Sequence, residues 1–328
     1  MDKWQHTISK PVSFAGIGLH SGKTVKLYIK PAGVNTGIRF VRTDLGRKVM
    51  IPATLYRVSD TRLATTLAKD EVTVSTTEHL LAALAGMGID NAVIELDNDE
   101  VPIMDGSAAP FVHVLKKVGR KRQKAARFLL KITKRIEIRN GDSVLLIEPY
   151  DGFKVSGEID FEHHLVRRQK FSLEVDAPTF IKEIASARTF GFLHEVEYLR
   201  KNGKALGGSL ENAIVIDQTE ILNREGLRFS NEFVRHKLLD LIGDLALLGC
   251  PVMGHITAIK SGHAQHLQLM KEIADHPECW QFIQWTDKGE ESAFEKVVMT
   301  TRAAGNKILP FLVPPQVLPV PSGTPLAV

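Results

Sequence analysis

Four ionisable side chains lie close together in a leucine-rich segment, residues 232–249, which reads EFVRHKLLDLIGDLALLG. They are His236, Lys237, Asp240 and Asp244. The spacing of the leucines predicts a helix with one apolar face. On such a helix His236 and Asp240 are i and i+4 neighbours, about 40° apart at the border of that face. The segment therefore predicts a row of ionisable groups beside the core.

A second predicted helix and a turn supply further candidates. Glu78 and His79 are adjacent in STTEHLLAALAGMGI, where Ser75 and Glu78 have the spacing of a capping box at a helix start. His263 follows a predicted strand in the turn of KSGHAQHLQL, a place where functional side chains are common. These residues can complete a site begun by the segment 232–249.

The residue types fit a catalytic zinc site, which takes three protein ligands and keeps a fourth position open. His79, His236 and Asp240 form such a set. Zinc polarises a carbonyl group and activates water, as hydrolysis of an amide requires. The residues alone leave alternatives open, because His79 equally fits a buried core histidine and the His236–Asp240 pair a solvated helix face.

Three other residues fit the proton transfers of a hydrolase. Glu78, beside a ligand, can take a proton from water, and a protonated His263 can give one to a leaving amine. Asp244 would hold His263 in its charged form if the two lie side by side. Glu78 can instead serve only as a helix cap, and His263 only as a turn residue.

Composition and charge exclude several classes of protein. Of the 328 residues 44% are hydrophobic and 24% charged, with a net charge of +4, as expected of a globular protein that binds a small anion. The basic run at residues 116–127 has no aromatic residues between its charges, so we expect a solvated linker and no nucleic-acid partner. Two cysteines, Cys250 and Cys279, and no secretory or membrane-spanning apolar run predict a cytoplasmic protein. In GIGLHSGK the glycine spacing is too short for a phosphate loop, which makes His20 a turn residue.

Short strands and two helices recur in the same order in both halves of the chain. Residues 24–31, 37–44 and 91–96 read as strands, and residues 131–149 as a hairpin with an Asn-Gly turn. The length exceeds that of one typical core, so we predict an α+β fold of two similar domains. The domains are residues 1–125 and 126–300, and residues 301–328 form a proline-rich tail without assigned chemistry.

Six motifs in this order carry a family resemblance: GIGLHSGK, TTEHLLAAL, ELDNDEVPIMDGSAAPF, SARTFGF, RFSNEFVRHKLLDLIGDLALLG and KSGHAQHLQL. Over residues 3–300 the chain resembles UDP-3-O-acyl-N-acetylglucosamine deacetylase, the zinc amidase of the first committed step of lipid A synthesis in Gram-negative bacteria. The resemblance implies two domains of like topology, each a sheet layered against helices, with the site between them. It also implies one Zn²⁺ per chain, bound by His79, His236 and Asp240.

The resemblance also assigns the other roles. It implies that Glu78 is the general base, that His263 is the acid or the residue stabilising the oxyanion, and that Asp244 is its partner. Thr189 is implied near the oxyanion, and Lys237 as an active-site lysine. Phe190 and Phe192 are implied to contact the sugar and the acyl passage. Residues 186–216, which read as strand, helix, glycine turn and strand, are implied to form an apolar channel for the acyl chain. The residues themselves fit an amphipathic unit with Phe192, Leu193 and Leu199 exposed along a groove, or simple packing on the parent domain.

The sequence therefore predicts a monomeric zinc amidase that hydrolyses the N-acetyl group of UDP-3-O-acyl-N-acetylglucosamine to UDP-3-O-acyl-glucosamine and acetate. Two alternatives stay open at this stage. One is a metal-dependent deacetylase of another N-acetylated sugar, and the other is a non-catalytic protein that binds a nucleotide sugar or nucleic acid. Whether Glu78 handles the protons alone or shares them with His263 is also open.

Overall fold

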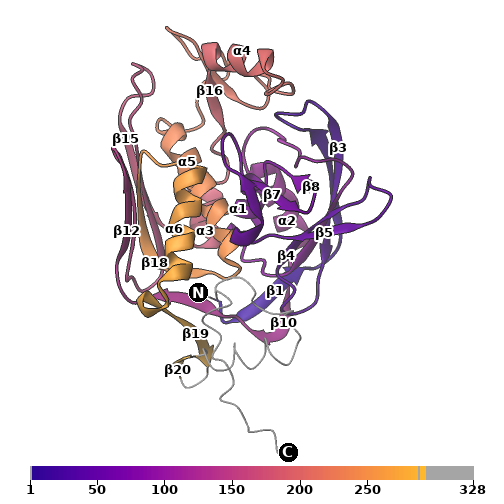
Figure 1. The fold of residues 1–328 in the computed structure, drawn as a ribbon, viewed down its shortest axis with the longest axis vertical. Coiled ribbons are helices and arrows are strands. Elements are labelled where there is room, and N and C mark those ends of the chain that lie inside the picture. Colours follow the sequence, from indigo (N-terminus) through magenta and orange to yellow (C-terminus); the bar gives the residue numbers. More distant parts are fainter. Residues whose placement is uncertain (1, 287–288, 293–328) are drawn as a thin grey trace, which may run out of the picture.

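Helices lie between two β-sheets in the computed structural model, which describes residues 2–286 and 289–292 (Figure 1). The central helices are α1 (Glu78–Gly86), α5 (Glu232–Leu245) and α6 (His263–Asp275). This arrangement confirms the predicted α+β class. The predicted proline-rich tail, residues 301–328, lies outside the described residues.

The first sheet has five strands in the order β2-β3-β9-β4-β5. Their bounds are β2 (Val12–Ile17), β3 (Thr24–Pro31), β9 (Ala92–Leu96), β4 (Ile38–Arg42) and β5 (Val49–Pro52). The strands predicted at residues 24–31, 37–44 and 91–96 are confirmed. On β3 every second residue, Val25, Leu27 and Ile29, is buried, because a strand turns alternate side chains to the core.

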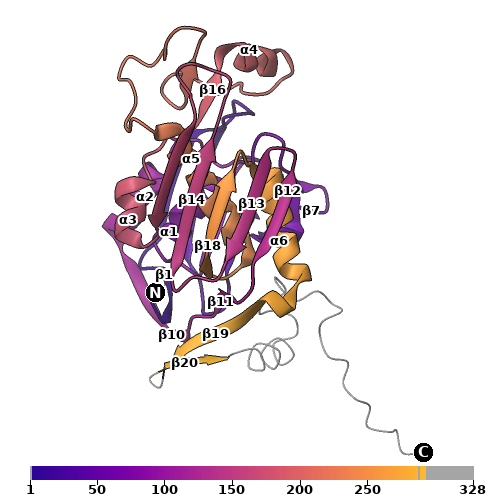
Figure 2. The ribbon, with the colours of Figure 1, turned by 90° about the vertical axis from the view of Figure 1, so that its left-hand side faces the viewer.

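The second sheet is larger, with β18 (Val252–Ile259) near its centre (Figure 2). Beside β18 lie the predicted hairpin β12 (Ile136–Asn140) and β13 (Ser143–Glu148) on one side and β14 (Phe153–Ile159) on the other. The remaining strands are β11 (Leu129–Ile132), β15 (Gln169–Glu174), β19 (Trp280–Thr286) and β20 (Gly289–Ser292).

Smaller elements complete the described fold. A three-stranded sheet joins β6 (Val58–Asp60), β7 (Thr66–Lys69) and β8 (Val72–Val74). Further helices are α2 (Ala109–Val118) and α3 (Ala177–Glu183), with 3-10 turns at Leu55–Arg57, Ala246–Leu248 and Pro277–Cys279. Among the described residues, no helix is both long and apolar enough to span a membrane.

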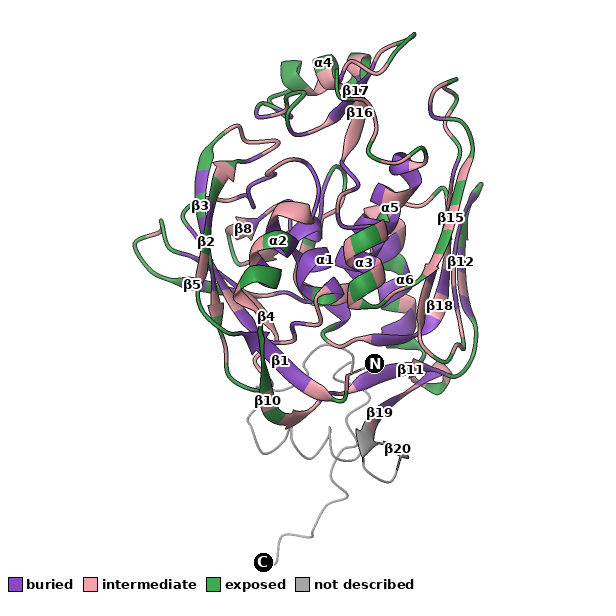
Figure 3. Ribbon diagram, turned by 180° about the vertical axis from the view of Figure 1, so that it is seen from behind, coloured by how far each residue is buried: buried purple, intermediate pink, exposed green. Residues whose placement is uncertain are grey.

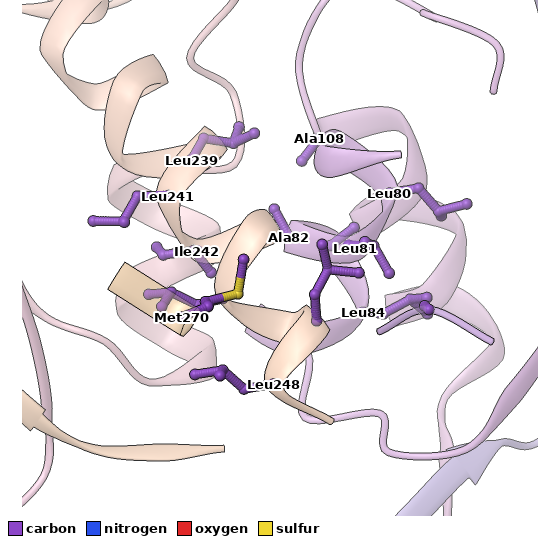
Figure 4. Packing of buried hydrophobic residues seen from close by; sticks show 14 of the residues in the cluster. Leu80, Leu81, Ala82, Leu84, Ala108, Leu239, Leu241, Ile242, Leu248 and Met270 are labelled. Atoms are coloured by element: carbon purple, nitrogen blue, oxygen red, sulfur yellow. The ribbon is translucent and has the colours of Figure 1, made fainter. Parts of the chain in front are cut away.

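Helices α1 and α5 pack against each other between the sheets, and α1 is almost entirely buried (Figure 3). Apolar side chains of both helices belong to one buried cluster, and Figure 4 shows Leu81 and Ala82 of α1 on the side toward α5, whereas Leu80 of α1 and Leu241 of α5 point outward from the helix pair. At Gly243 a Cβ atom would lie 2.0 Å from the backbone oxygen of Glu78. The glycine is therefore what lets α5 approach the first turn of α1, where Glu78 and His79 lie.

The basic run at residues 116–127 is not a linker, so that prediction is wrong. It ends α2 and then forms β10 (Arg120–Ala126), which pairs antiparallel with β1 (Trp4–Ile8). The Arg122 guanidinium lies 4.3 Å from the centre of the Trp4 ring, a cation–π contact. The strand depends on a partner at the other end of the chain, which local periodicity does not reveal. The domain limits at residues 125 and 126 stay a prediction.

The segment 186–216 projects from the rest of the fold (Figure 1). It contains β16 (Phe190–Phe192), α4 (Leu193–Lys201) and β17 (Ile214–Ile216), which confirms the predicted order of strand, helix and strand. The predicted exposure of Phe192 is wrong, since its side chain is buried in a cluster with Ile214 and Ile216. Leu193 and Leu199 are half-buried.

Candidate metal centre and catalytic residues

The first turn of α1 and the middle of α5 bring His79, His236 and Asp240 together, as the sequence predicted. The Nε2 atoms of His79 and His236 lie 3.5 Å and 3.4 Å from Asp240 Oδ1. The two imidazole rings are T-shaped, with centres 5.0 Å apart. All three side chains are buried, and one donor atom of each lies within 4.8 Å of the others. The ligand triad, as we call these residues, has the spacing of groups that share one ion.

Hydrogen bonds leave the inner atoms of the ligand triad free for a cation. His236 Nδ1 donates to the backbone oxygen of Ala187 at 3.1 Å, so its Nε2 keeps the lone pair that faces Asp240. Lys237 Nζ donates to Asp240 Oδ2 at 3.1 Å. The other oxygen, Asp240 Oδ1, is buried without a hydrogen-bond partner within the described part of the chain. A buried carboxylate oxygen that faces two imidazole nitrogens is a position that zinc fits.

The protonation states favour metal binding as well. Burial lowers the pKa of His236 to about 3, so the ring is neutral at physiological pH. Burial alone would raise the pKa of Asp240, but His236 and Lys237 hold it well below its usual range. Neutral imidazole and ionised carboxylate are the forms that bind metal.

Glu78 lies next to the ligand triad, and its carboxylate is held in place by the backbone. The N–H of Thr65 donates to Glu78 Oε2 at 3.0 Å, and Glu78 Oε1 lies 4.0 Å from His263 Nε2. The predicted capping box is wrong: α1 begins at Glu78 with Thr77 as N-cap, and no side chain caps it. Burial raises the pKa of Glu78, which makes its carboxylate a stronger base.

Asp244 and His263 form a short contact, also as predicted. His263 Nδ1 donates to Asp244 Oδ2 at 2.6 Å. Burial would lower the pKa of His263, but the Asp244 carboxylate, aided by Glu78, raises it to about 10. His263 is therefore protonated at neutral pH, with Nε2 directed to Glu78.

Two residues of the site were missed by the sequence analysis. Thr65 Oγ1 donates to Asp244 Oδ1 at 2.5 Å, and His266 Nδ1 donates to Asp244 Oδ2 at 2.7 Å. The spacing of His263 and His266 on one helix, three residues apart, was a visible signal that both share a face. Thr65 lies in a loop whose sequence carries no such signal.

The other predicted site residues are Lys237 on α5 and three residues of the segment 186–216. Lys237 Nζ lies 5.7 Å from the centre of the Phe190 ring, which lies 6.3 Å from the His236 ring. Thr189 is fixed by backbone hydrogen bonds to Gly106 and Ile214. Phe192 is further along β16 and packs on the rings of Phe161 and His163, not on the ligand triad.

A buried ligand triad beside a basic carboxylate and a protonated histidine is typical of metal-dependent hydrolases. The family model for LpxC, UDP-3-O-acyl N-acetylglycosamine deacetylase, matches residues 5–275. The chain belongs to this family. It is a hydrolase that acts on an amide and removes the N-acetyl group of a UDP-3-O-acyl amino sugar in lipid A biosynthesis. Enzymes of the family use zinc.

Individual relatives agree with the family assignment. A UDP-3-O-acyl-N-acetylglucosamine deacetylase from Myxococcus xanthus is 52% identical over 279 residues, which cover 85% of this chain and 89% of that protein. Proteins of the same name from Acidithiobacillus ferrooxidans and Shewanella pealeana are 46% and 48% identical, over 91% and 88% of this chain and 99% and 95% of their own lengths.

Proposed function

We propose that the chain hydrolyses the N-acetyl amide of UDP-3-O-acyl-N-acetylglucosamine with one zinc ion bound by His79, His236 and Asp240. The observation that carries the proposal is Asp240 Oδ1, a buried carboxylate oxygen that faces two imidazole nitrogens and has no hydrogen-bond donor among the described residues. When bound, zinc supplies a Lewis acid that polarises the acetyl carbonyl and makes water nucleophilic near neutral pH.

Glu78 and His263 divide the proton transfers between them. Glu78 accepts a proton from the attacking water, since burial makes it the stronger base and the Thr65 N–H orients it. His263 donates a proton to the departing amine nitrogen, since the contact with Asp244 keeps it charged. His263 is protonated at neutral pH, as a proton donor to the amine requires, and this supports the division over a single base. Water and amide thus become acetate and amine.

The remaining residues bind the substrate. Thr189 lies two residues beyond Ala187, the acceptor of the His236 ring, and we assign its hydroxyl to the developing oxyanion. Lys237 has a half-buried ammonium group near Phe190, which suits contact with the anionic nucleotide sugar. Phe190 contacts the sugar. We assign the segment 186–216 to the side of the site that receives the acyl chain, with Phe192 inside the buried cluster that supports this segment.

Metal analysis tests the proposal. Purified enzyme is assayed for deacetylation and for bound zinc, before and after chelation and after zinc is returned. We expect one zinc per chain, loss of activity on chelation and recovery with zinc. Activity that persists in fully chelated enzyme would refute the metal centre.

A matched pair of variants tests the ligands. His79→Ala is expected to lose zinc, whereas His276→Ala, which removes an exposed histidine paired with Glu278, should keep it. Substrate without the 3-O-acyl chain separates this function from deacetylation of another N-acetylated sugar, because only the proposed enzyme needs the chain. A cytoplasmic location and a monomeric state stay predictions from the sequence.

A further inference from the structure

The Asp244 carboxylate is the centre of a buried group of four side chains. It accepts hydrogen bonds from Thr65 Oγ1 on one oxygen and from the Nδ1 atoms of His263 and His266 on the other. Asp244 and His266 are each only 1% exposed. His263 has a place in the proposed reaction, but the second histidine on the same oxygen has none so far.

We propose that His266 is a positioning residue of the deacetylation reaction, which acts on His263 through the Asp244 carboxylate. This inference rests on the proposed role of His263 as proton donor. The two ring nitrogens of His266 face Asp244 and Ser261, so the proposed influence of His266 on the reaction passes through the Asp244 carboxylate.

The direction of the hydrogen bonds follows from the carboxylate. An ionised carboxylate only accepts, so both Nδ1 atoms carry hydrogen. The Nε2 atom of His263 then points to Glu78, 4.0 Å away, while that of His266 lies 3.3 Å from Ser261 Oγ. The two rings are nearly perpendicular, with centres 5.9 Å apart. One oxygen therefore fixes two rings in different directions, and only the His263 ring faces the reaction.

His266 can donate to Asp244 without adding charge. Burial lowers the pKa of His266, although Asp244 beside it acts in the opposite direction. The charged groups that act on the His263 ring are Asp244, Glu78 and Asp240, and those that act on His266 are Asp244, His263 and Asp240. Because His266 is neutral, the negative charge of Asp244 is not offset by a second cation and stabilises the protonated form of His263. The second donor still limits rotation of the carboxylate and so keeps Oδ2 in line with His263.

The test compares two replacements of the same shape. His266→Asn keeps an amide N–H near the position of Nδ1, whereas His266→Leu replaces it with a methyl group. We expect His266→Leu to lower kcat roughly 10-fold, as for the loss of a hydrogen bond to a charged group, with KM and zinc content unchanged. His266→Asn should recover most of kcat. Equal loss in both variants, or wild-type kcat in His266→Leu, would overturn the inference.

A double-mutant cycle asks whether the effect passes through Asp244. In an Asp244→Asn background, His266→Leu should cost little further kcat, because the carboxylate it positions is gone. Additive losses would mean that His266 acts independently of Asp244, against the inference. The wild-type enzyme in the same assay separates the proposed function from the proposed role of His266. If the wild type shows no zinc-dependent deacetylation, the proposed function is refuted; if it does and the variants behave otherwise than expected, only the role of His266 is refuted.

Discussion

Two groups of the same composition, two histidines and one aspartate each, lie one helical turn apart along α5. The ligand triad is His79, His236 and Asp240, and the relay group is Asp244, His263 and His266. In the ligand triad the imidazole nitrogens are 3.4–3.5 Å from a carboxylate oxygen that receives no hydrogen bond from the part of the chain described. In the relay group two N–H donors lie 2.6 Å and 2.7 Å from theirs.

The difference shows that hydrogen bonds, not residue types, decide what such a group can do. His236 donates its Nδ1 hydrogen to the backbone oxygen of Ala187, so the lone pair on its Nε2 faces Asp240. His263 donates its Nδ1 hydrogen to Asp244, and because the ring is protonated its Nε2 also carries a hydrogen. Under the proposed function, the same two residue types thus serve as a metal site in one place and as a proton donor in the other.

The largest effect is expected for Asp240→Asn in the ligand triad. The amide removes the negative charge that holds the metal, so zinc content and activity should both fall to background. Elemental analysis and the deacetylation assay measure this. If the variant kept stoichiometric zinc, Asp240 would not be a zinc ligand, and the ligand triad would not differ from the relay group in binding metal.

The same substitution in the relay group should behave differently. Asp244→Asn removes the partner that keeps His263 charged, so we expect kcat to fall by about 10²–10⁴ as for a lost general acid. Zinc content should be unchanged because Asp244 is no ligand. Loss of zinc in Asp244→Asn would show that the relay group helps to bind the metal.

The relay group also predicts the alkaline limb of the pH profile. The pKa of His263 is raised to about 10, and its active form is the protonated one. Activity should therefore persist below that pH and be lost as the pH rises through it. In Asp244→Asn the stabilising charge is absent, so the limb should move to lower pH. A profile of kcat against pH for both enzymes checks the sign, and a limb that does not move would contradict it.

The smallest effect is expected at the edge of the relay group. Thr65→Val removes the hydroxyl that donates to Asp244 Oδ1 but keeps the backbone N–H that holds Glu78. We expect kcat to fall roughly 10-fold, since Asp244 retains its two histidine donors. Thr66→Val is the matched control, because its hydroxyl donates to Ser75 and not to the site. Equal kcat in both variants would show that the Thr65 hydroxyl does not support the relay group.

Local patterns predicted those parts of the molecule that depend on nearby residues. The alternation on β3 and the helix within residues 232–249 were confirmed. The single apolar face was not, because α5 is buried on almost all sides, the two aspartates included. The strand β10 was missed because its pairing with β1 joins distant segments. The capping box of Ser75 and Glu78 was predicted wrongly because spacing alone does not show that the Glu78 carboxylate accepts from Thr65 instead.

The site residues divide in the same way. His79, His236 and Asp240 were identified by type and by family resemblance, and the structure brings them together. Thr65 was missed because its loop reaches Asp244 only in the folded chain. The burial of Phe192 was missed because it depends on packing against β17 and Phe161.

The ligand triad takes its members from both sides of the packed helix pair, His79 from α1 and the other two from α5. Neither side alone has a complete set, so the binding site exists only while the two helices are docked. Any ligand that binds the folded chain and not the unfolded one adds its binding free energy to folding. Zinc bound by these residues would thus act as a reversible cross-link between α1 and α5, and its release would weaken the docking of the two helices.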